Sequence, residues 1–270
     1  MAHVGGWRRH PGHEPPRRSS LSEGEGLFGV WPATSLPVAK AILGVTMVVF
    51  GLQLMANFRS EPSLSTLFGG GSVLEAIRAG ALLSAPSLVK MEPWRLLSAC
   101  FVHFGLLHVG MNMLGLVHLS RLLEPAVGSV RLLIVYVATG IVGFAASVAY
   151  YSEFGRPTPT AGASGAIFGL MGAILGILYR RKDPRWKPFL AQTVGYSLMF
   201  GLLMRGINNA AHVAGLLSGA ALGLLMARAA PAPSTWWQRV LAALCAVSVG
   251  ASLVLARLSD LPEVLAGLGG

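Results

Sequence analysis

Residues 130–151, VRLLIVYVATGIVGFAASVAYY, decide the fold class of this chain. Beyond Arg131 the stretch has no charged side chain. A helix needs about 20 mainly apolar residues to cross the hydrocarbon core of a bilayer. We therefore predict a transmembrane helix over residues 130–151.

Six further apolar stretches flank this one along the chain. They cover residues 38–57, 101–121, 161–179, 188–204, 209–228 and 236–256. The chain is 53% hydrophobic and only 12% charged, with a mean hydropathy of +0.62, whereas about a quarter of the residues in a soluble domain are charged. The composition predicts an all-α membrane protein, a polytopic bundle of seven helices in a lipid bilayer.

The basic residues indicate how this bundle is oriented. The chain has 21 Lys and Arg against 11 Asp and Glu, and the basic residues cluster between apolar stretches, as in residues 180–187. A nucleic-acid surface would gather them on one polar face, so we expect no nucleic-acid partner. Because cytoplasmic loops retain Lys and Arg, we predict a cytoplasmic N-terminus and an external C-terminus. The basic start of the chain fits a bacterial plasma membrane.

Three regions follow from this pattern. Residues 1–36 are rich in Arg, Pro and Gly and lack the apolar core of a signal peptide, which predicts a disordered basic cytoplasmic tail. Residues 37–230 hold six helices. Residues 231–270 hold a linker, the seventh transmembrane helix and a short external tail.

The longest external loop, residues 58–100, is expected to lie on the membrane surface. Ser72 and Glu75 have the spacing of a capping box at the start of a short helix. Trp94 and Arg95 close the loop. Two interpretations of this pair stay open, an interfacial aromatic with a snorkelling cation or a direct functional role.

No acidic residue falls at mid-membrane depth in these stretches, and this weighs against two classes of membrane protease. Membrane aspartyl proteases need two embedded Asp residues, and membrane zinc proteases need H-E-x-x-H. Cys100 and Cys245 lie in apolar stretches without CxxC or Cys/His spacing, so we interpret them as small buried apolar side chains. We expect no metal and no cofactor.

Polar side chains at membrane depth are candidates for function because they are costly there. They are His103, His108, Asn112, His118, Ser164, Asn208, Asn209 and His212. Ser164 and His212 lie near the external starts of the fourth and sixth helices, so the topology puts them at similar depth. A serine hydroxyl needs a base to take its proton, and histidine is the usual base. We predict a Ser164–His212 dyad.

His108 and Asn112 lie four residues apart, on one face of a helix. They predict hydrogen-bond donors for an oxyanion. A metal site is the competing interpretation, although no carboxylate or cysteine lies near them in sequence. His118 is interpreted as an interfacial histidine near the cytoplasmic end.

Glycines recur every four residues on the two helices that carry the dyad. Gly165 and Gly169 lie on one, and Gly215, Gly219 and Gly223 lie on the other. Such stripes let two backbones approach closely, and this approach would bring Ser164 within reach of His212. Taken alone, the stripes indicate packing and nothing more.

Together these residues resemble the rhomboid family over roughly residues 75–228. The resemblance is carried by Gly80-Ala81, Glu92-Pro93-Trp94-Arg95-Leu96-Leu97, His103, His108, Asn112-Met113, Glu124, Gly128, Gly162-Ala163-Ser164-Gly165, Ala211-His212, Gly215 and Gly219, in that order. The seventh helix resembles the six-plus-one form of the family.

The resemblance implies an intramembrane serine protease that cleaves transmembrane segments of membrane proteins through an acyl-enzyme. Ser164 would be the nucleophile and His212 the general base and acid. His108, Asn112 and the Ser164 amide would form the oxyanion hole, and no third acid is implied. His103 would support the long loop and a water-filled cavity. Phe168 replaces a tyrosine of some relatives and would stack on His212.

The resemblance also implies substrates with small residues at the cut and helices that unwind easily. It leaves the oligomeric state open. Two alternatives stay open as well. One is a proteolytically inactive rhomboid-like protein that binds membrane clients, and the other is a small-solute channel or transporter, against which the lack of embedded carboxylates weighs.

Overall fold

The structure, a computed structural model, describes residues 36–60, 63, 65–68, 72–155, 157–203, 208–227 and 235–261. The tail expected before residue 36, the linker expected at 231–234 and the external tail expected from residue 262 lie outside the described residues.

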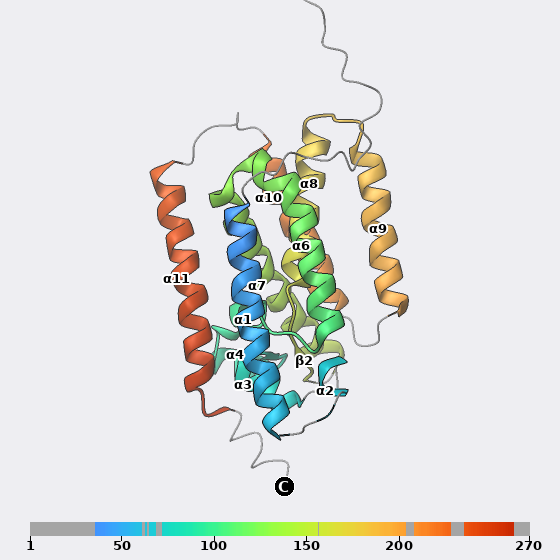
Figure 1. Cartoon of the computed structure of the whole chain (residues 1–270). Coiled ribbons are helices and arrows are strands. Elements are labelled where there is room, and N and C mark those ends of the chain that lie inside the picture. The colour runs from blue at the N-terminus through green and yellow to red at the C-terminus, as the bar shows by residue number, and fades with distance from the viewer. Residues whose placement is uncertain are drawn as a thin grey trace, which may run out of the picture. The chain divides into compact units, whose positions relative to one another are not determined.

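Long helices form over all seven predicted stretches (Figure 1). They are α1 (Pro37–Ser60), α6 (Leu106–Val127), α7 (Ser129–Phe154), α8 (Ser164–Arg180), α9 (Trp186–Leu203), α10 (Asn209–Met226) and α11 (Trp236–Leu258). Five of them, α1, α6, α7, α10 and α11, are long and apolar enough to cross a membrane by length and composition, and α8 is a shorter apolar helix of 17 residues. The predicted all-α polytopic membrane fold is confirmed.

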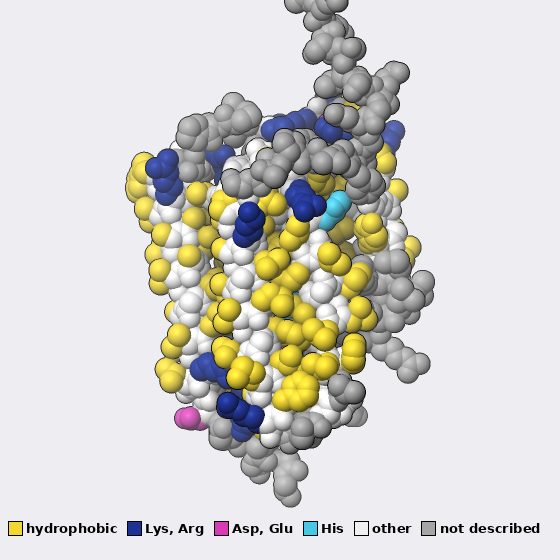
Figure 2. All heavy atoms as spheres, viewed as in Figure 1, with side chains coloured by type: hydrophobic (Ala, Val, Ile, Leu, Met, Phe, Trp, Pro, Cys, Tyr) yellow, Lys and Arg dark blue, Asp and Glu magenta, His cyan; other side chains and the backbone are white. Residues whose placement is uncertain are grey.

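Apolar side chains cover the flanks of the helices, and Lys and Arg gather near the helix ends (Figure 2). Exposed apolar side chains include Val48, Leu114, Leu198, Leu217 and Val247. An apolar surface of this kind marks contact with lipid. The chain is an integral, multi-pass membrane protein.

The second stretch begins differently from the prediction, because α6 starts at Leu106 and not at residue 101. Gly105, with a φ of 151°, precedes the helix, and residues 99–105 form a turn deep in the bundle. His103 therefore lies before α6 and not on it. At its other end α6 stops at Gly128, whose φ of 86° makes the sharp connection to α7.

Glu124, near the end of α6, fixes the start of α1. Its buried carboxylate accepts hydrogen bonds from the backbone N–H groups of Val38 (3.1 Å) and Ala39 (3.3 Å), and from the Ser129 hydroxyl (2.7 Å). The first N–H groups of a helix have no partner within it and form the positive end of its dipole. Glu124 therefore joins α1, α6 and α7 at one end of the bundle.

The expected surface loop is a folded cap on the other end of the bundle. It contains α2 (Ser65–Phe68), α3 (Val73–Ala79), β1 (Leu82–Leu83), α4 (Pro86–Met91) and α5 (Arg95–Ser98). Strand β1 pairs antiparallel with β2 (Pro159–Thr160), with Leu82 opposite Thr160. This short sheet joins the loop to the segment that leads into α8.

The capping box predicted at Ser72 and Glu75 is wrong. Ser72 occupies the N-cap position of α3, but its side chain makes no capping hydrogen bond. Glu75 instead pairs with Arg78 in the next turn. The guanidinium three residues on is a nearer and oppositely charged partner for the carboxylate.

The snorkelling interpretation of Arg95 is also wrong, since only 2% of this residue is exposed. Its guanidinium pairs with Glu92 and donates to the carbonyl oxygens of Ile77 (2.6 Å) and Ala81 (2.9 Å). A buried cation is tolerated when its N–H groups meet acceptors. Arg95 therefore holds the turns of the loop together.

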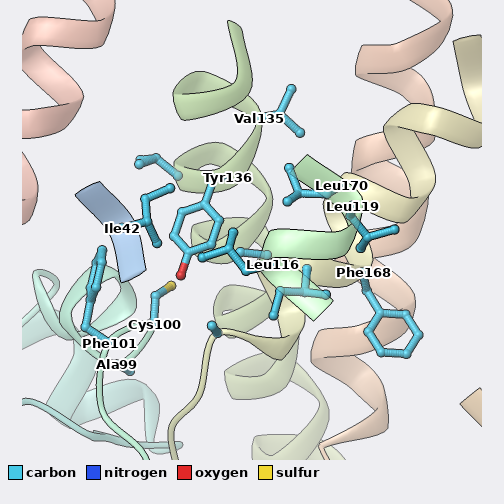
Figure 3. Close-up of a cluster of buried hydrophobic side chains, with 14 of the residues drawn as sticks. Ile42, Ala99, Cys100, Phe101, Leu116, Leu119, Val135, Tyr136, Phe168 and Leu170 are labelled. Atoms are coloured by element: carbon cyan, nitrogen blue, oxygen red, sulfur yellow. The ribbon is translucent and has the colours of Figure 1, made fainter. Parts of the chain in front are cut away.

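A core of buried side chains joins the cap to the helices (Figure 3). Tyr136 of α7 lies at its centre, with its ring 6.1 Å from the ring of Phe101. Cys100 is a free, buried thiol, and Cys245 is free and half-buried. Side chains of the turn at residues 99–105, such as Cys100 and Phe101, belong to this core, which therefore fixes the turn.

Helices α8 and α10 pack backbone to backbone. A Cβ added at Gly215, Gly219 or Gly223 would overlap the carbonyl oxygen of Gly165, Gly169 or Ala173, respectively. On α8, the positions that point into α10 include Gly172 and Gly176, whereas a Cβ at Gly169 would point into Thr139 of α7. Helix α8 thus has close contacts on two sides, and the expected α8 stripe reaches further along the helix than Gly165 and Gly169.

Candidate active site

Ser164 and His212 meet where α8 and α10 begin. Ser164 is the first residue of α8, and His212 lies in the first turn of α10. The distance from His212 Nε2 to Ser164 Oγ is 2.7 Å. The glycine contacts between the two helices allow this approach, because a larger residue at Gly215 would push the helices apart one turn below.

The ring of Phe168 stacks on the ring of His212, with centroids 4.3 Å apart and planes 8° from parallel. Phe168 lies one turn after Ser164 on the same face of α8. The stacked ring restricts the orientations open to the imidazole, so that Nε2 stays directed at the serine hydroxyl.

The backbone before Ser164 turns sharply at Gly162, which has a φ of 126°. A Cβ at this position would also lie 2.7 Å from Nε2 of His108. The Gly162 N–H donates to the carbonyl oxygen of Ala99 (2.9 Å). Both the conformation and the space therefore require glycine here.

His103 holds the next peptide of this turn. Its Nε2 accepts a hydrogen bond from the Ala163 N–H (3.3 Å), and its Nδ1 lies 3.3 Å from the carbonyl oxygen of Phe101. A neutral ring satisfies both contacts with its proton on Nδ1. Unlike His108, His103 is fully buried and does not line the cavity described below.

Gln53 of α1 supports His103 and was missed by the sequence analysis. Its side-chain amide donates to the carbonyl oxygen of His103 (2.9 Å) and is 4% exposed. The signal in the sequence was an amide side chain in the apolar stretch 38–57, four residues before Asn57.

His108 and Asn112 lie on one face of α6, and both line the same cavity as the dyad. His108 Nδ1 accepts from the Phe104 N–H (3.3 Å), so a neutral ring carries its proton on Nε2, the atom that faces Gly162. The Asn112 side-chain amide donates one N–H to the carbonyl oxygen of His108 (2.9 Å). An amide nitrogen has two N–H groups, which leaves the second one for another acceptor.

Asn208 fixes the start of α10. Its Oδ1 accepts from the Ala211 N–H (3.1 Å), and its Nδ2 donates to the Ser147 hydroxyl on α7 (2.5 Å). Ser147 is in turn 3.3 Å from the hydroxyl of Ser84 in the cap. From the sequence, Asn208 is predicted only as a polar residue at membrane depth, and neither its role nor its partners follow from it.

A cavity of about 630 Å³ opens beside the dyad. Three helices contribute side chains at helical spacing, with Met111, Leu114, Gly115, His118 and Leu119 from α6, Ile167, Phe168 and Met171 from α8, and Phe189, Gln192, Thr193 and Tyr196 from α9. Most of the lining is apolar. His118, interpreted as interfacial, belongs to this lining. Among the described residues that line the cavity, none is Asp or Glu.

Nor do three His, Cys, Asp or Glu side chains come together as metal ligands anywhere in the part of the chain that the structure describes. His108 has Asn112, Phe104 and Gly162 around it. The arrangement offers two donors directed at the turn of Ser164, and these suit an oxyanion better than a cation.

The chain is similar in sequence to proteins of one known family. The Rhomboid domain matches residues 90–229. The chain is 33% identical to rhomboid protease GluP of Bacillus subtilis over 219 residues, which are 76% of this chain and 39% of that protein. It is 30% identical to rhomboid-type serine protease 2 of Emericella nidulans, over 71% of this chain and 39% of that protein. It is 32% identical to RHOMBOID-like protein 5 of Arabidopsis thaliana, over 73% of this chain and 68% of that protein.

The chain thus spans about two fifths of the length of the first two of these relatives. The matched domain begins at α4 in the cap and ends just after α10, so it contains Ser164, His212, His108 and Asn112. Helices α1 and α11 lie outside it.

Proposed function

Because the chain belongs to the rhomboid family, we propose that it is an intramembrane serine endopeptidase, with residues 37–230 as its catalytic core. It cleaves transmembrane segments of other membrane proteins. The observation that carries this proposal is the 2.7 Å contact between His212 Nε2 and Ser164 Oγ at the end of an apolar cavity.

In the first step His212 Nε2 takes the proton of Ser164 while Oγ attacks the carbonyl carbon of the scissile peptide. Negative charge develops on the carbonyl oxygen. The His108 Nε2–H, the second N–H of Asn112 and the Ser164 amide are the donors that stabilise it. The intermediate then collapses, the peptide C–N bond breaks, and His212 gives its proton to the leaving amine.

The acyl-enzyme is released by water. His212 takes a proton from the water, the hydroxide attacks the ester carbonyl carbon, and the Ser164 oxygen leaves with the proton that His212 returns. None of the described residues that line the cavity is Asp or Glu, so no carboxylate among them orients the imidazole. Stacking on Phe168 and the Asn208 cap at the start of α10 fill this role.

The cavity suits a transmembrane segment as substrate. Its lining runs along α6 from Leu107 to Leu119, a rise of roughly 18 Å at about 1.5 Å per residue. The walls are apolar, like the side chains of a membrane helix. We propose that the cut lies near the external end of the substrate, at small residues and in helices that unwind easily.

The orientation belongs to the same proposal. The basic residues between α8 and α9 support a cytoplasmic position for that connection, and the first turns of α8 and α10 would then open to the external side. A bacterial plasma membrane is the proposed location.

The test is cleavage by the purified full chain in detergent. The wild type and Ser164→Ala are incubated with a generic transmembrane substrate, with and without a serine-directed isocoumarin. We expect cleavage by the wild type alone, and its loss with the inhibitor. Substrate that is bound but left intact by the wild type would instead support an inactive binder of membrane clients and reject the protease.

A further inference from the structure

Helix α11 packs on the side of the bundle through one face and lies outside the matched domain (Figure 1). Its contacts are with α7, α5 and α3. Ala242, Ser252 and Ala256 are buried on this face, whereas Val247 and Leu258 are exposed on the other. The small buried residues let α11 approach the cap as well as α7.

The external end of α11 makes two contacts with the cap. The Ser259 hydroxyl accepts a hydrogen bond from Nη2 of Arg95 (3.1 Å). One turn earlier, a Cβ at Gly80 would lie only 3.2 Å from the Cβ of Ala256. Both contacts fall on the turns of the cap that Arg95 already holds through Ile77 and Ala81.

From there a series of contacts leads to the nucleophile. The Ser98 hydroxyl donates to the carbonyl oxygen of Gly80 (2.8 Å), and Ser98 lies on α5 with Arg95. Directly after α5, the carbonyl oxygen of Ala99 accepts from the Gly162 N–H (2.9 Å). Gly162 lies two residues before Ser164.

We propose that the external end of α11, through Ser259 and Ala256, positions the turn that presents Ser164 and its amide. Ser259 and Ala256 are positioning residues, since neither lies in the cavity. The inference rests on the proposed protease function.

The proposed role of α11 predicts an effect on kcat and not on KM. The Ser164–His212 contact depends on the packing of α8 against α10, which α11 does not touch through these residues. The cap instead positions the Gly162 turn, and therefore the Ser164 amide and the side of the oxyanion hole that faces His108. Loosening this turn weakens stabilisation of the transition state and leaves substrate binding intact.

The experiment compares four variants of the full chain with the wild type. Ser259→Ala removes the hydroxyl that accepts from Arg95 Nη2 and from the Leu261 N–H (3.0 Å). Ser259→Thr keeps a hydroxyl, and Ala256→Leu places a large side chain against Gly80. Ser252→Ala is the matched control, because its buried hydroxyl bonds only the Val249 carbonyl of its own helix (2.8 Å). The measurements are kcat, KM, the rate at which a fluorophosphonate labels Ser164, thermal stability in detergent, and hydrogen exchange of the Gly162 and Ala163 amides.

Ser259→Ala loses the hydrogen bond from Arg95 Nη2 and the local one from the Leu261 N–H. Only the first reaches the cap, so we expect kcat and the labelling rate to fall roughly fivefold, with KM unchanged. Ala256→Leu should lose more, Ser259→Thr should retain most of the activity, and Ser252→Ala should match the wild type. Hydrogen exchange of the Gly162 and Ala163 amides should become faster in Ser259→Ala and Ala256→Leu only.

Wild-type kcat in both Ser259→Ala and Ala256→Leu would overturn the proposal. So would a rise in KM alone, or a loss of thermal stability without faster exchange at Gly162 and Ala163. If the wild type itself neither cleaves nor takes the label, the protease proposal fails. The exchange measurement then still decides whether α11 positions this turn.

Discussion

At the scale of single residues, the proposed mechanism makes Ser164 and His212 one unit, since the hydroxyl would be a nucleophile only while the imidazole takes its proton. Ser164→Ala and His212→Ala should therefore each abolish cleavage, and the double variant should be no worse. Cleavage in detergent measures this. Labelling by a fluorophosphonate should also require His212. Losses that multiply in the double variant, or label on another serine, would contradict the dyad.

The proposed oxyanion donors, His108 and Asn112, give a second prediction at this scale. His108→Ala and Asn112→Ala should each lower kcat by about a hundredfold, because each removes one donor to the developing charge. KM should change little. The Michaelis parameters of each variant check this, beside its thermal stability in detergent, since both side chains also make structural hydrogen bonds. Wild-type turnover in both variants would exclude these roles.

Sequence alone pointed to Ser164, His212, His108 and Asn112 because polar side chains stand out in apolar stretches. It did not reveal Gln53 or the buried position of Arg95. Their partners are the carbonyl oxygens of His103, Ile77 and Ala81, which any residue possesses. Such contacts leave no side-chain pattern to recognise, and only the fold brings them together.

At the scale of helices, the contact between α8 and α10 makes the third prediction. A leucine at Gly219 would overlap the carbonyl oxygen of Gly169 and push the helices apart. A shift of about 1 Å at a reacting centre can cost roughly a hundredfold in rate. Gly219→Leu should thus insert normally in the membrane and cleave at about that reduced rate. Membrane fractionation and kcat check it.

The control for this variant is Ala221→Leu, which adds the same side chain on the exposed face of α10. It should keep wild-type kcat. Leu222, which points away from the glycine stripe by helical spacing, packs partly against the core and is a poorer control. Full activity in Gly219→Leu would mean that the glycine contact does not set the distance between Ser164 and His212.

The start of α10 provides the fourth prediction. Asn208→Ala removes a helix cap and should cost about 1 kcal/mol of stability. It also removes the bond to Ser147, so His212 should lose its fixed position and kcat should fall. Asn208→Asp keeps the acceptor for the Ala211 N–H but not the donor to Ser147. Thermal unfolding and kcat of both variants distinguish the effect of the bond to the Ala211 N–H from that of the bond to Ser147. Equal kcat in all three proteins would remove Asn208 from the positioning of His212.

Helix positions followed well from the sequence, because a run of apolar residues is a local property. The start of α6 did not. A turn at residues 99–105 is as apolar as a helix, and its hydrogen bonds to Gly162 and Ala163 lie about 60 residues away along the chain. The pairing of β1 with β2 is equally remote in sequence. Apolar composition predicts that a segment is buried. Whether it forms a helix or a turn depends on its hydrogen-bond partners, which here are remote in sequence.

At the scale of the whole molecule, the helix directions make the location of the C-terminus a test of the architecture. Helix α1 begins at the end of the bundle where Glu124 ends α6, and α11 finishes at the opposite end, where Ser259 meets Arg95 of the cap. Ser164 and His212 lie at this same end, since α8 and α10 both begin there (Figure 1). The end of α11 therefore lies on the same side of the membrane as Ser164 and His212.

In the proposed orientation that side is external, because the basic residues at 180–187, between α8 and α9, favour the cytoplasm for the opposite end. A reporter fused after Gly270 should lie outside the cytoplasm, and one inserted after Lys182 should lie inside. Paired enzyme reporters, each active on one side only, measure this in intact cells. A cytoplasmic reporter after Gly270 would mean that α11 does not cross the membrane in the direction the fold requires. Ser259 could not then reach Arg95 on the external side, and the positioning role of α11 would fail, while the side assigned to Ser164 and His212 would stand on α1 to α10.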